Sequence, residues 1–159
     1  MKKTQNIWIP VFLIILLFFS CRDVENFPIE PHIDYKSFGT ILSVSNTDSL
    51  GILSISFEDG DGDIGSENQE NYFINIFQMV DGEMQKVELP DTSVNFNAII
   101  PDLTPKGKYK GIKGTIDYLL ELYNFTPLLD SDTIAFETYI KDRAGHQSNT
   151  VMTPNIIVK

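Results

Sequence analysis

The stretch GILSISFEDGDGDIG (residues 51–65) decides the fold of this 159-residue chain. Its first half alternates, so that Leu53, Ile55 and Phe57 share one face of an extended strand. Its second half places an aspartate at every second position with glycines between them, which is typical of a tight turn. The stretch therefore predicts a half-buried β-strand that ends in an acidic loop.

Short strands are also predicted around this stretch. NYFINIFQMV (71–80) and EMQKVEL (83–89) are separated by Asp81-Gly82, a dipeptide typical of hairpin turns. VNFNAII (94–100), DTIAFETYIKD (132–142) and TPNIIVK (153–159) add further strands. Short strands with Gly, Pro, Asn and Asp between them predict one all-β sandwich of about seven strands. The core residues that we predict are Leu53, Ile55, Phe57, Ile74, Ile76, Ile134, Phe136 and Ile140.

Residues 114–123 (GTIDYLLELY) fit two patterns. Ile116, Leu119, Leu120 and Tyr123 have helical spacing, whereas alternate residues of the same segment fit a strand. The strand-rich surroundings and Gly114 favour the strand.

The N-terminus has the organisation of a bacterial signal peptide. Two lysines precede an apolar run, residues 7–19, which is too short to span a bilayer comfortably and indicates a signal sequence more than an anchor helix. The run ends in Ser20-Cys21, and Cys21 is the only cysteine in the chain, so no intramolecular disulfide can form. This end resembles the lipobox of bacterial lipoproteins, although Phe18 stands where leucine is preferred.

The resemblance implies that residues 1–20 are removed and that Cys21 carries a diacylglycerol and an N-acyl chain. Two or more acyl chains are enough for stable anchoring in a membrane. Residues 21–34 hold many acids and two prolines and are predicted to be an extended tether, and residues 35–159 form the sandwich domain. Removal of Lys2 and Lys3 with the signal peptide changes the formal charge from −10 to −12, which argues against nucleic acid as a partner and against lying flat on anionic lipid.

One basic segment stands out in this acidic chain. Residues 106–114 (KGKYKGIKG) hold four of the ten basic residues that remain after residue 20. Such a run is typical of a solvated loop whose lysines protect the start of a strand, and a patch that touches the membrane is the alternative.

The sequence has no recognisable catalytic pattern. The two histidines, His32 and His146, form no metal-binding pair, and no GxSxG elbow, phosphate loop or dinucleotide fingerprint is present. The remaining acids are typical of a solvated surface, and we expect the protein not to be an enzyme.

The aspartate loop is the best candidate for a site. Asp59, Asp61 and Asp63 can direct several carboxylates inward, and calcium prefers such oxygen ligands. The spacing is similar to an EF-hand loop, but Ile64 stands where that loop needs glycine and the flanking segments are predicted strands. A turn whose aspartates bind only their own backbone is the alternative.

A second loop is expected to lie beside the first. IKDRAGHQSN (140–149) resembles the F–G turn of bacterial immunoglobulin-like and fibronectin III-like modules. Strands B and F run in the same direction in such sandwiches, so both loops and the incoming tether reach one pole. We therefore predict that Asp142 joins the three aspartates at a structural calcium site, with Glu30 or Asp34 nearby.

Nearly the whole mature chain resembles a group of lipoproteins from Bacteroidota-type bacteria. The resemblance is carried by PHI in the tether, by FEDGDGDIG, KGTI and DRAGHQSN, and by the terminal TPNIIV. It implies an immunoglobulin-like domain on a lipid anchor in the outer membrane of a diderm bacterium, and it implies no activity. The acids that follow Cys21 loosely resemble surface-export signals, which favours the cell surface over the periplasm.

Two functions are compatible with these features. The first is a lipid-anchored envelope protein that binds or scaffolds an unknown envelope protein or glycan without catalysis. The second is a calcium-dependent carbohydrate-binding module of a glycan-uptake system. That module needs exposed aromatic side chains, for which the candidates are Tyr118, Tyr123, Phe125 and Tyr139.

The lipid anchor can be tested directly. Metabolic labelling with a fatty-acid analogue is expected to mark the wild-type chain at Cys21 and to leave the Cys21→Ser variant unlabelled. Equal labelling of the two proteins would contradict the lipoprotein interpretation.

Overall fold

The computed structural model describes residues 26–41, 50–88, 96–107 and 110–158. Its strands are β1 (His32–Ile41), β2 (Leu50–Asp59), β3 (Tyr72–Val80), β4 (Glu83–Lys86), β5 (Ile112–Glu121), β6 (Thr133–Ile140), β7 (Val151–Met152) and β8 (Ile156–Ile157). Two short 3₁₀ helices, η2 (Leu122–Asn124) and η3 (Thr126–Leu128), follow β5. Residues 1–25, including the predicted signal peptide and Cys21, lie outside the described part, as do residues 89–95.

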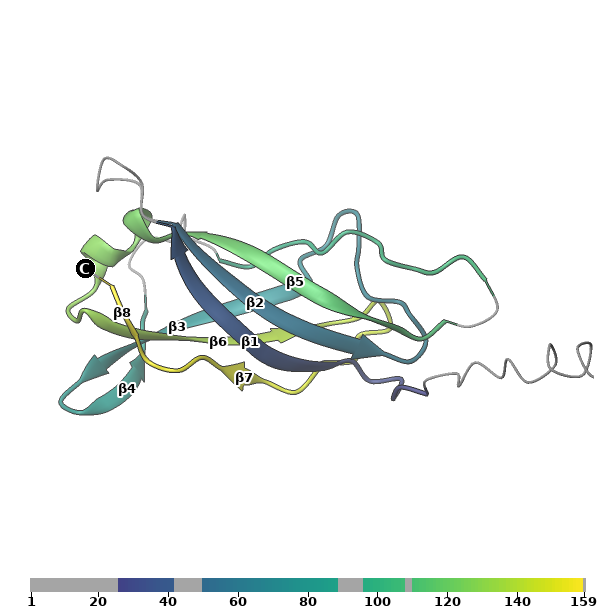
Figure 1. The fold of residues 1–159 in the computed structure, drawn as a ribbon, viewed down its shortest axis with the longest axis horizontal. Coiled ribbons are helices and arrows are strands. Elements are labelled where there is room, and N and C mark those ends of the chain that lie inside the picture. Colours follow the sequence, from purple (N-terminus) through teal and green to yellow (C-terminus); the bar gives the residue numbers. More distant parts are fainter. Residues whose placement is uncertain (1–25, 42–49, 89–95, 108–109, 159) are drawn as a thin grey trace, which may run out of the picture.

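The strands form two antiparallel sheets that pack face to face (Figure 1). One sheet has the order β1-β2-β5, and the other has the order β4-β3-β6-β7, with β8 also paired to β6. This is the all-β, immunoglobulin-like sandwich that the sequence predicts. Among the described residues, no helix is long and apolar enough to cross a membrane.

The core lies between the sheets and is made by the alternating positions of the strands. Along β2 every second residue is buried, from Gly51 to Asp59. All eight predicted core residues are at most 6% exposed, so this prediction is confirmed. Phe136 lies at the centre, stacked on Phe38 and in edge contact with Phe125.

The hairpin and the ambiguous segment follow the predictions. Asp81 and Gly82 both have positive φ, as a two-residue hairpin turn between β3 and β4 requires. The segment 114–123 is a strand up to Glu121, paired with β2 along its length, and only its last residues enter η2. β1 begins at His32, three residues before the predicted start of the sandwich domain at residue 35.

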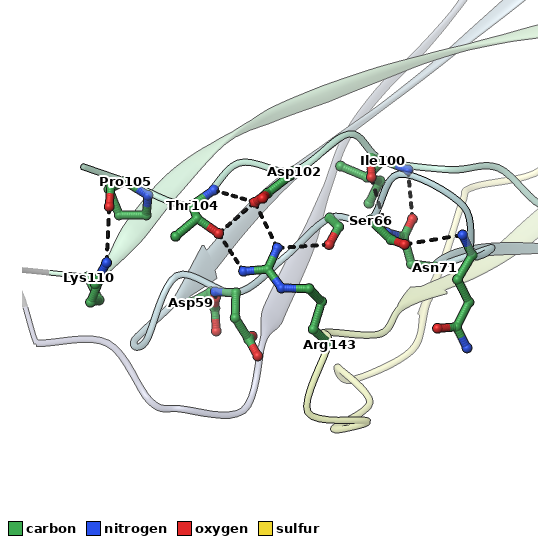
Figure 2. Close-up of polar contacts among 12 residues, drawn as sticks. Asp59, Ser66, Asn71, Ile100, Asp102, Thr104, Pro105, Lys110 and Arg143 are labelled. Atoms are coloured by element: carbon green, nitrogen blue, oxygen red, sulfur yellow. Dashed lines mark hydrogen bonds and ion pairs between the residues drawn. The ribbon is translucent and has the colours of Figure 1, made fainter. Parts of the chain in front are cut away.

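The predicted strand at 94–100 is wrong for its described part, residues 96–100. Only Ala98 makes a β-bridge there, with Tyr72. The reason is the buried side chain of Asn71, which binds both backbone groups of Ile100: its amide donates to the Ile100 carbonyl (3.1 Å) and its oxygen accepts the Ile100 N–H (2.6 Å) (Figure 2). The Asn71 side chain thus takes the place of the backbone hydrogen bonds that would continue the pairing of this segment with β3.

Asn71 is therefore expected to be essential for holding residues 98–101 against β3. Asn71→Ala leaves the buried Ile100 N–H without a partner, at a cost of about 1–3 kcal/mol in the free energy of unfolding. The Ile100 carbonyl loses one bond but still accepts the Ser66 N–H (2.8 Å). Urea denaturation should show this loss. Asn75→Ala is the matched control, because Asn75 bonds Glu137 on the half-buried outer face of the sheet and should cost less than about 1 kcal/mol. Equal losses for the two variants would contradict this interpretation.

Candidate cation site

The loop after β2 is held by backbone contacts at its glycines. The Gly60 N–H donates to the Pro28 carbonyl (2.7 Å), and a Cβ on Gly60 would overlap the carbonyl oxygen of Phe27. Gly62 has φ +66°, and a Cβ there would overlap the carbonyl oxygen of Lys110. Glycine is needed at both positions, because the loop is packed between the incoming chain and the segment before β5.

The aspartates alternate with these glycines along the loop. A second loop packs against the side on which their carboxylates are buried. Ile64 and Asp142 form an antiparallel bridge, and the Arg143 N–H donates to the Asp63 carbonyl (3.3 Å). Carboxylate oxygens of Asp59, Asp63 and Asp142 all lie within 4.8 Å of one another. The structure thus brings together three of the four predicted ligands.

Several oxygens in this cluster are buried without a hydrogen-bond donor. Asp59 is 0% exposed; its Oδ2 accepts the Asp63 N–H (2.9 Å), but its Oδ1 has no partner. Asp63 is similar, with the Ala144 N–H on Oδ2 (3.2 Å) and an unpartnered, buried Oδ1. Asp61 also buries an unpartnered Oδ1, although it is not within the 4.8 Å group. Buried acceptors without donors are costly, so the arrangement calls for a proton or a cation.

The pKa values of these carboxyl groups reflect the same unfavourable burial of negative charge. Burial raises the pKa of Asp59 to about 6, and the charges of Asp61, Asp63 and Asp142 add to the increase against the hydrogen bond from the Asp63 N–H. Burial also raises the pKa of Asp63, followed by the charge of Asp142. Each carboxylate makes its neighbours harder to ionise.

Asp142 is oriented by His146. Its side chain is fully buried; Oδ1 accepts the His146 N–H (2.8 Å) and Oδ2 lies 2.8 Å from His146 Nδ1. The hydrogen bond to Asp142 raises the pKa of His146. The two loops are therefore linked through fixed carboxylates rather than through free surface charges.

Arg143 adjoins Asp142 in sequence, but its charge offsets only part of the rise in the pKa of Asp63. Its guanidinium donates to Asp102 Oδ1 (2.7 Å), to the Gly65 carbonyl (3.0 Å) and to the Thr104 hydroxyl (Figure 2). Hydrogen bonds from Thr104 and then from Arg143 lower the pKa of Asp102 to about 2. Arg143 thus clamps residues 102–104 onto the aspartate loop and leaves the cluster acidic.

Sequence reasoning missed this clamp. The only local signal is the Asp102-Leu103-Thr104 turn, in which the Thr104 N–H donates to Asp102 Oδ1 (2.9 Å). The partner Arg143 is 41 residues further along the chain.

The other residues named with the site are dispersed. Glu30 lies near enough to His146 to raise its pKa, whereas Asp34 lies on the outer face of β1, 3.7 Å from His32. Among the candidate sugar-binding aromatics, Phe125 is fully buried and Tyr118 packs edge-on against Tyr72. Tyr139 stacks on Phe73, and Tyr123 is half-buried.

The donor set fits a hard cation. All the candidate ligand atoms are carboxylate oxygens, which suit calcium, magnesium or manganese rather than zinc or copper. Oxygens around one calcium at 2.3–2.6 Å lie at most about 5 Å apart, and the three oxygens here satisfy that limit. One cation would contact Asp59, Asp63 and Asp142, with Asp61 as the nearest further carboxylate.

The comparisons with known proteins add no assignment. A scan against models of protein families finds no match, and a search of curated proteins finds no significant relative.

The raised pKa of Asp59 predicts an unusual pH dependence for the metal-free protein. An acid whose pKa is higher in the folded state destabilises the fold when it is ionised, and this penalty is relieved as the pH falls from about 6 toward the ordinary value of 3.8. In the presence of a metal chelator, the melting temperature should therefore rise as the pH is lowered from 7 to 5.

His146 contributes in the same direction, because a raised histidine pKa also stabilises the fold at lower pH. Asp59→Asn separates the two effects: it should melt higher than the wild type at pH 7 and gain less on acidification. Asp117→Asn, on the outer face of β5 where it accepts from Ser54, is the control and should behave as the wild type. A wild-type melting temperature that falls steadily from pH 7 to pH 5 would refute the prediction.

Proposed function

We propose that the protein is a lipid-anchored, non-catalytic β-sandwich of the cell envelope, whose anchor-side pole is stabilised by calcium. The observation that carries the calcium site is the fully buried Asp59, whose Oδ1 has no donor and whose carboxylate has an oxygen within 4.8 Å of carboxylate oxygens of Asp63 and Asp142. A buried carboxylate of this kind is stable when a cation offsets its charge.

Calcium is favoured over the transition metals by the all-oxygen ligands. It is favoured over magnesium by the irregular origin of those ligands, which come from the end of a strand, a glycine loop and a second turn. Calcium accepts flexible geometry, whereas magnesium demands a near-ideal octahedron.

The anchor is supported by Cys21, five residues before the described part begins, and by the short apolar run that precedes it. We place the protein in the outer membrane of a diderm bacterium, with the lipoproteins of Bacteroidota-type bacteria as the group it resembles.

The role that we infer for the cation is positional. The aspartate loop contacts the incoming chain through Gly60 and Pro28 and the segment before β5 through Gly62 and Lys110. A cation in the cluster would stiffen this pole and hold the domain in a fixed relation to its anchor. The opposite end of the sandwich is then presented to a partner, which we expect to be an envelope protein or a glycan.

Calcium should raise the melting temperature of the protein. Sites in extracellular modules bind at about 10⁻⁴–10⁻³ M, and calcium at one hundred times the dissociation constant stabilises the folded state by about 2.7 kcal/mol. For a domain of this size, that is a shift of several degrees in a thermal scan with calcium against chelator.

Asp63→Asn keeps the shape of the side chain but removes the charge of one of the three ligands, and its calcium shift should be much smaller than that of the wild type. Asp117→Asn removes a charge from the outer face of β5 and should keep the full shift. A magnesium shift as large as the calcium shift, or an undiminished shift in Asp63→Asn, would overturn the calcium site.

A further inference from the structure

The chain between the predicted anchor and the folded domain is short. Phe27 and Pro28 already pack on the domain: the Pro28 carbonyl accepts the Gly60 N–H, and the Phe27 ring lies 5.9 Å from Lys113 Nζ. Asn149 fixes the chain again by donating to the Ile33 carbonyl and accepting its N–H, both at 2.8 Å. Only residues 22–26 then separate Cys21 from the docked chain, which limits the distance to about 20 Å.

The end of the sandwich that receives this chain has a distinctive surface, which we call the anchor pole. It consists of residues 26–31, the aspartate loop, the 142–146 turn and the described residues 101–107 and 110–113. Figure 1 shows the segment that leads into β5 projecting from this end of the sandwich, where the chain also enters β1. The 3₁₀ helices after β5 lie at the opposite end.

Apolar and basic side chains are exposed together at the anchor pole. Ile29 is 59% exposed and Leu103 is 37% exposed. Leu103 is held outward in an ordered turn, because its N–H donates to the Ile64 carbonyl (3.2 Å) and the next residue bonds Asp102. Lys106 and Lys110 of the same segment are also exposed, and Lys110 Nζ donates to the Pro105 carbonyl (3.2 Å; Figure 2).

Several acidic side chains of the anchor pole are buried or paired, so they offset the positive charge of the lysines less than their number suggests. Asp59 and the side chain of Asp142 are buried in the cluster, and Asp102 is paired with Arg143 at 2.7 Å. Asp61 and Asp63 are half-buried, and Glu30 is the exposed acid among residues 26–31. The cluster therefore faces inward, while lysines and apolar side chains face outward.

We propose that the anchor pole rests on the bilayer, with Leu103 and Ile29 at the boundary between headgroups and acyl chains and with Lys106 and Lys110 beside lipid phosphates. The inference rests on the proposed lipid anchor and deepens it. Apolar side chains flanked by lysines bind membrane surfaces in this manner, and the short linker keeps the pole within reach of the lipid. Membrane contact at a second point fixes the tilt of the domain, which attachment at one point cannot do.

Fluorescence quenching by brominated lipids tests the contact. The full-length, acylated chain is placed in vesicles of equal amounts of brominated phosphatidylcholine and phosphatidylglycerol. Because acylation occupies the only cysteine, a bimane label attaches to one introduced thiol, at Leu103→Cys or at the matched Leu128→Cys in η3 at the far end, where the leucine is 46% exposed. The label at 103 should lose about half of its fluorescence, since apolar groups at the interface enter to about 5–10 Å, and the label at 128 should lose none.

Charge variants test the part played by the lysines. The double variant Lys106→Gln, Lys110→Gln should be quenched less at position 103, as should the unaltered chain when salt shortens the Debye length from about 8 Å to about 3 Å. Lys86→Gln in β4 should change nothing. Equal quenching at 103 and 128 in an acylated chain overturns this inference alone, whereas absence of an acyl group from Cys21, seen by fatty-acid labelling of the same sample, overturns the anchor and the inference together.

Discussion

Repulsion among the buried carboxylates of Asp59, Asp63 and Asp142 is the constraint on which the anchor pole depends. Their oxygens lie within 4.8 Å of one another, and the first two each bury an oxygen without a donor. Isolated charges in such a place would be expelled to water or neutralised by a raised pKa. The sandwich keeps them together because Asp59 occupies the last inward position of β2, continuing the alternation that buries Leu53, Ile55 and Phe57. Hydrophobic packing along β2 thus holds the carboxylate of Asp59 in a buried position that it would not occupy by itself.

The surrounding contacts hold the cluster in place without satisfying it. Backbone amides bond one oxygen each of Asp59 and Asp63, and His146 occupies Asp142. The nearest guanidinium, that of Arg143, is directed to Asp102, Thr104 and the Gly65 carbonyl. Donors are therefore present around the loop, yet they leave the inner oxygens open. This is the arrangement expected of a preorganised cation site, in which the protein fixes the ligands and the ion supplies the missing charge.

The predictions from sequence held where local signals decide the structure and failed where a distant side chain decides it. Alternation identified β2, β3 and β6 and their core residues, and Asp81-Gly82 identified the hairpin. The strand at 94–100 was wrong because the Asn71 side chain, 29 residues from Ile100, replaces the backbone ladder. The meeting of the two acidic loops was predictable from chain direction. The Arg143 clamp was not, because its partner side chains, Asp102 and Thr104, lie 41 and 39 residues away and the turn that they form indicates no distant arginine.

The cluster joins parts of the chain that would otherwise move independently. The incoming residues 27–28, the aspartate loop, the segment at Lys110 and the turn at 142–146 contact one another through the backbone of this loop. A cation that binds both the loop and the turn lowers the free energy only of the state in which both are docked. Its binding therefore makes the docking of the loop and the turn cooperative. Weak, non-covalent binding of a cation is enough for this effect, because the cation only has to hold the docked segments in position. In the function that we propose, the buried acids of this pole hold the ion, and the exposed lysines leave its outer surface free to approach lipid.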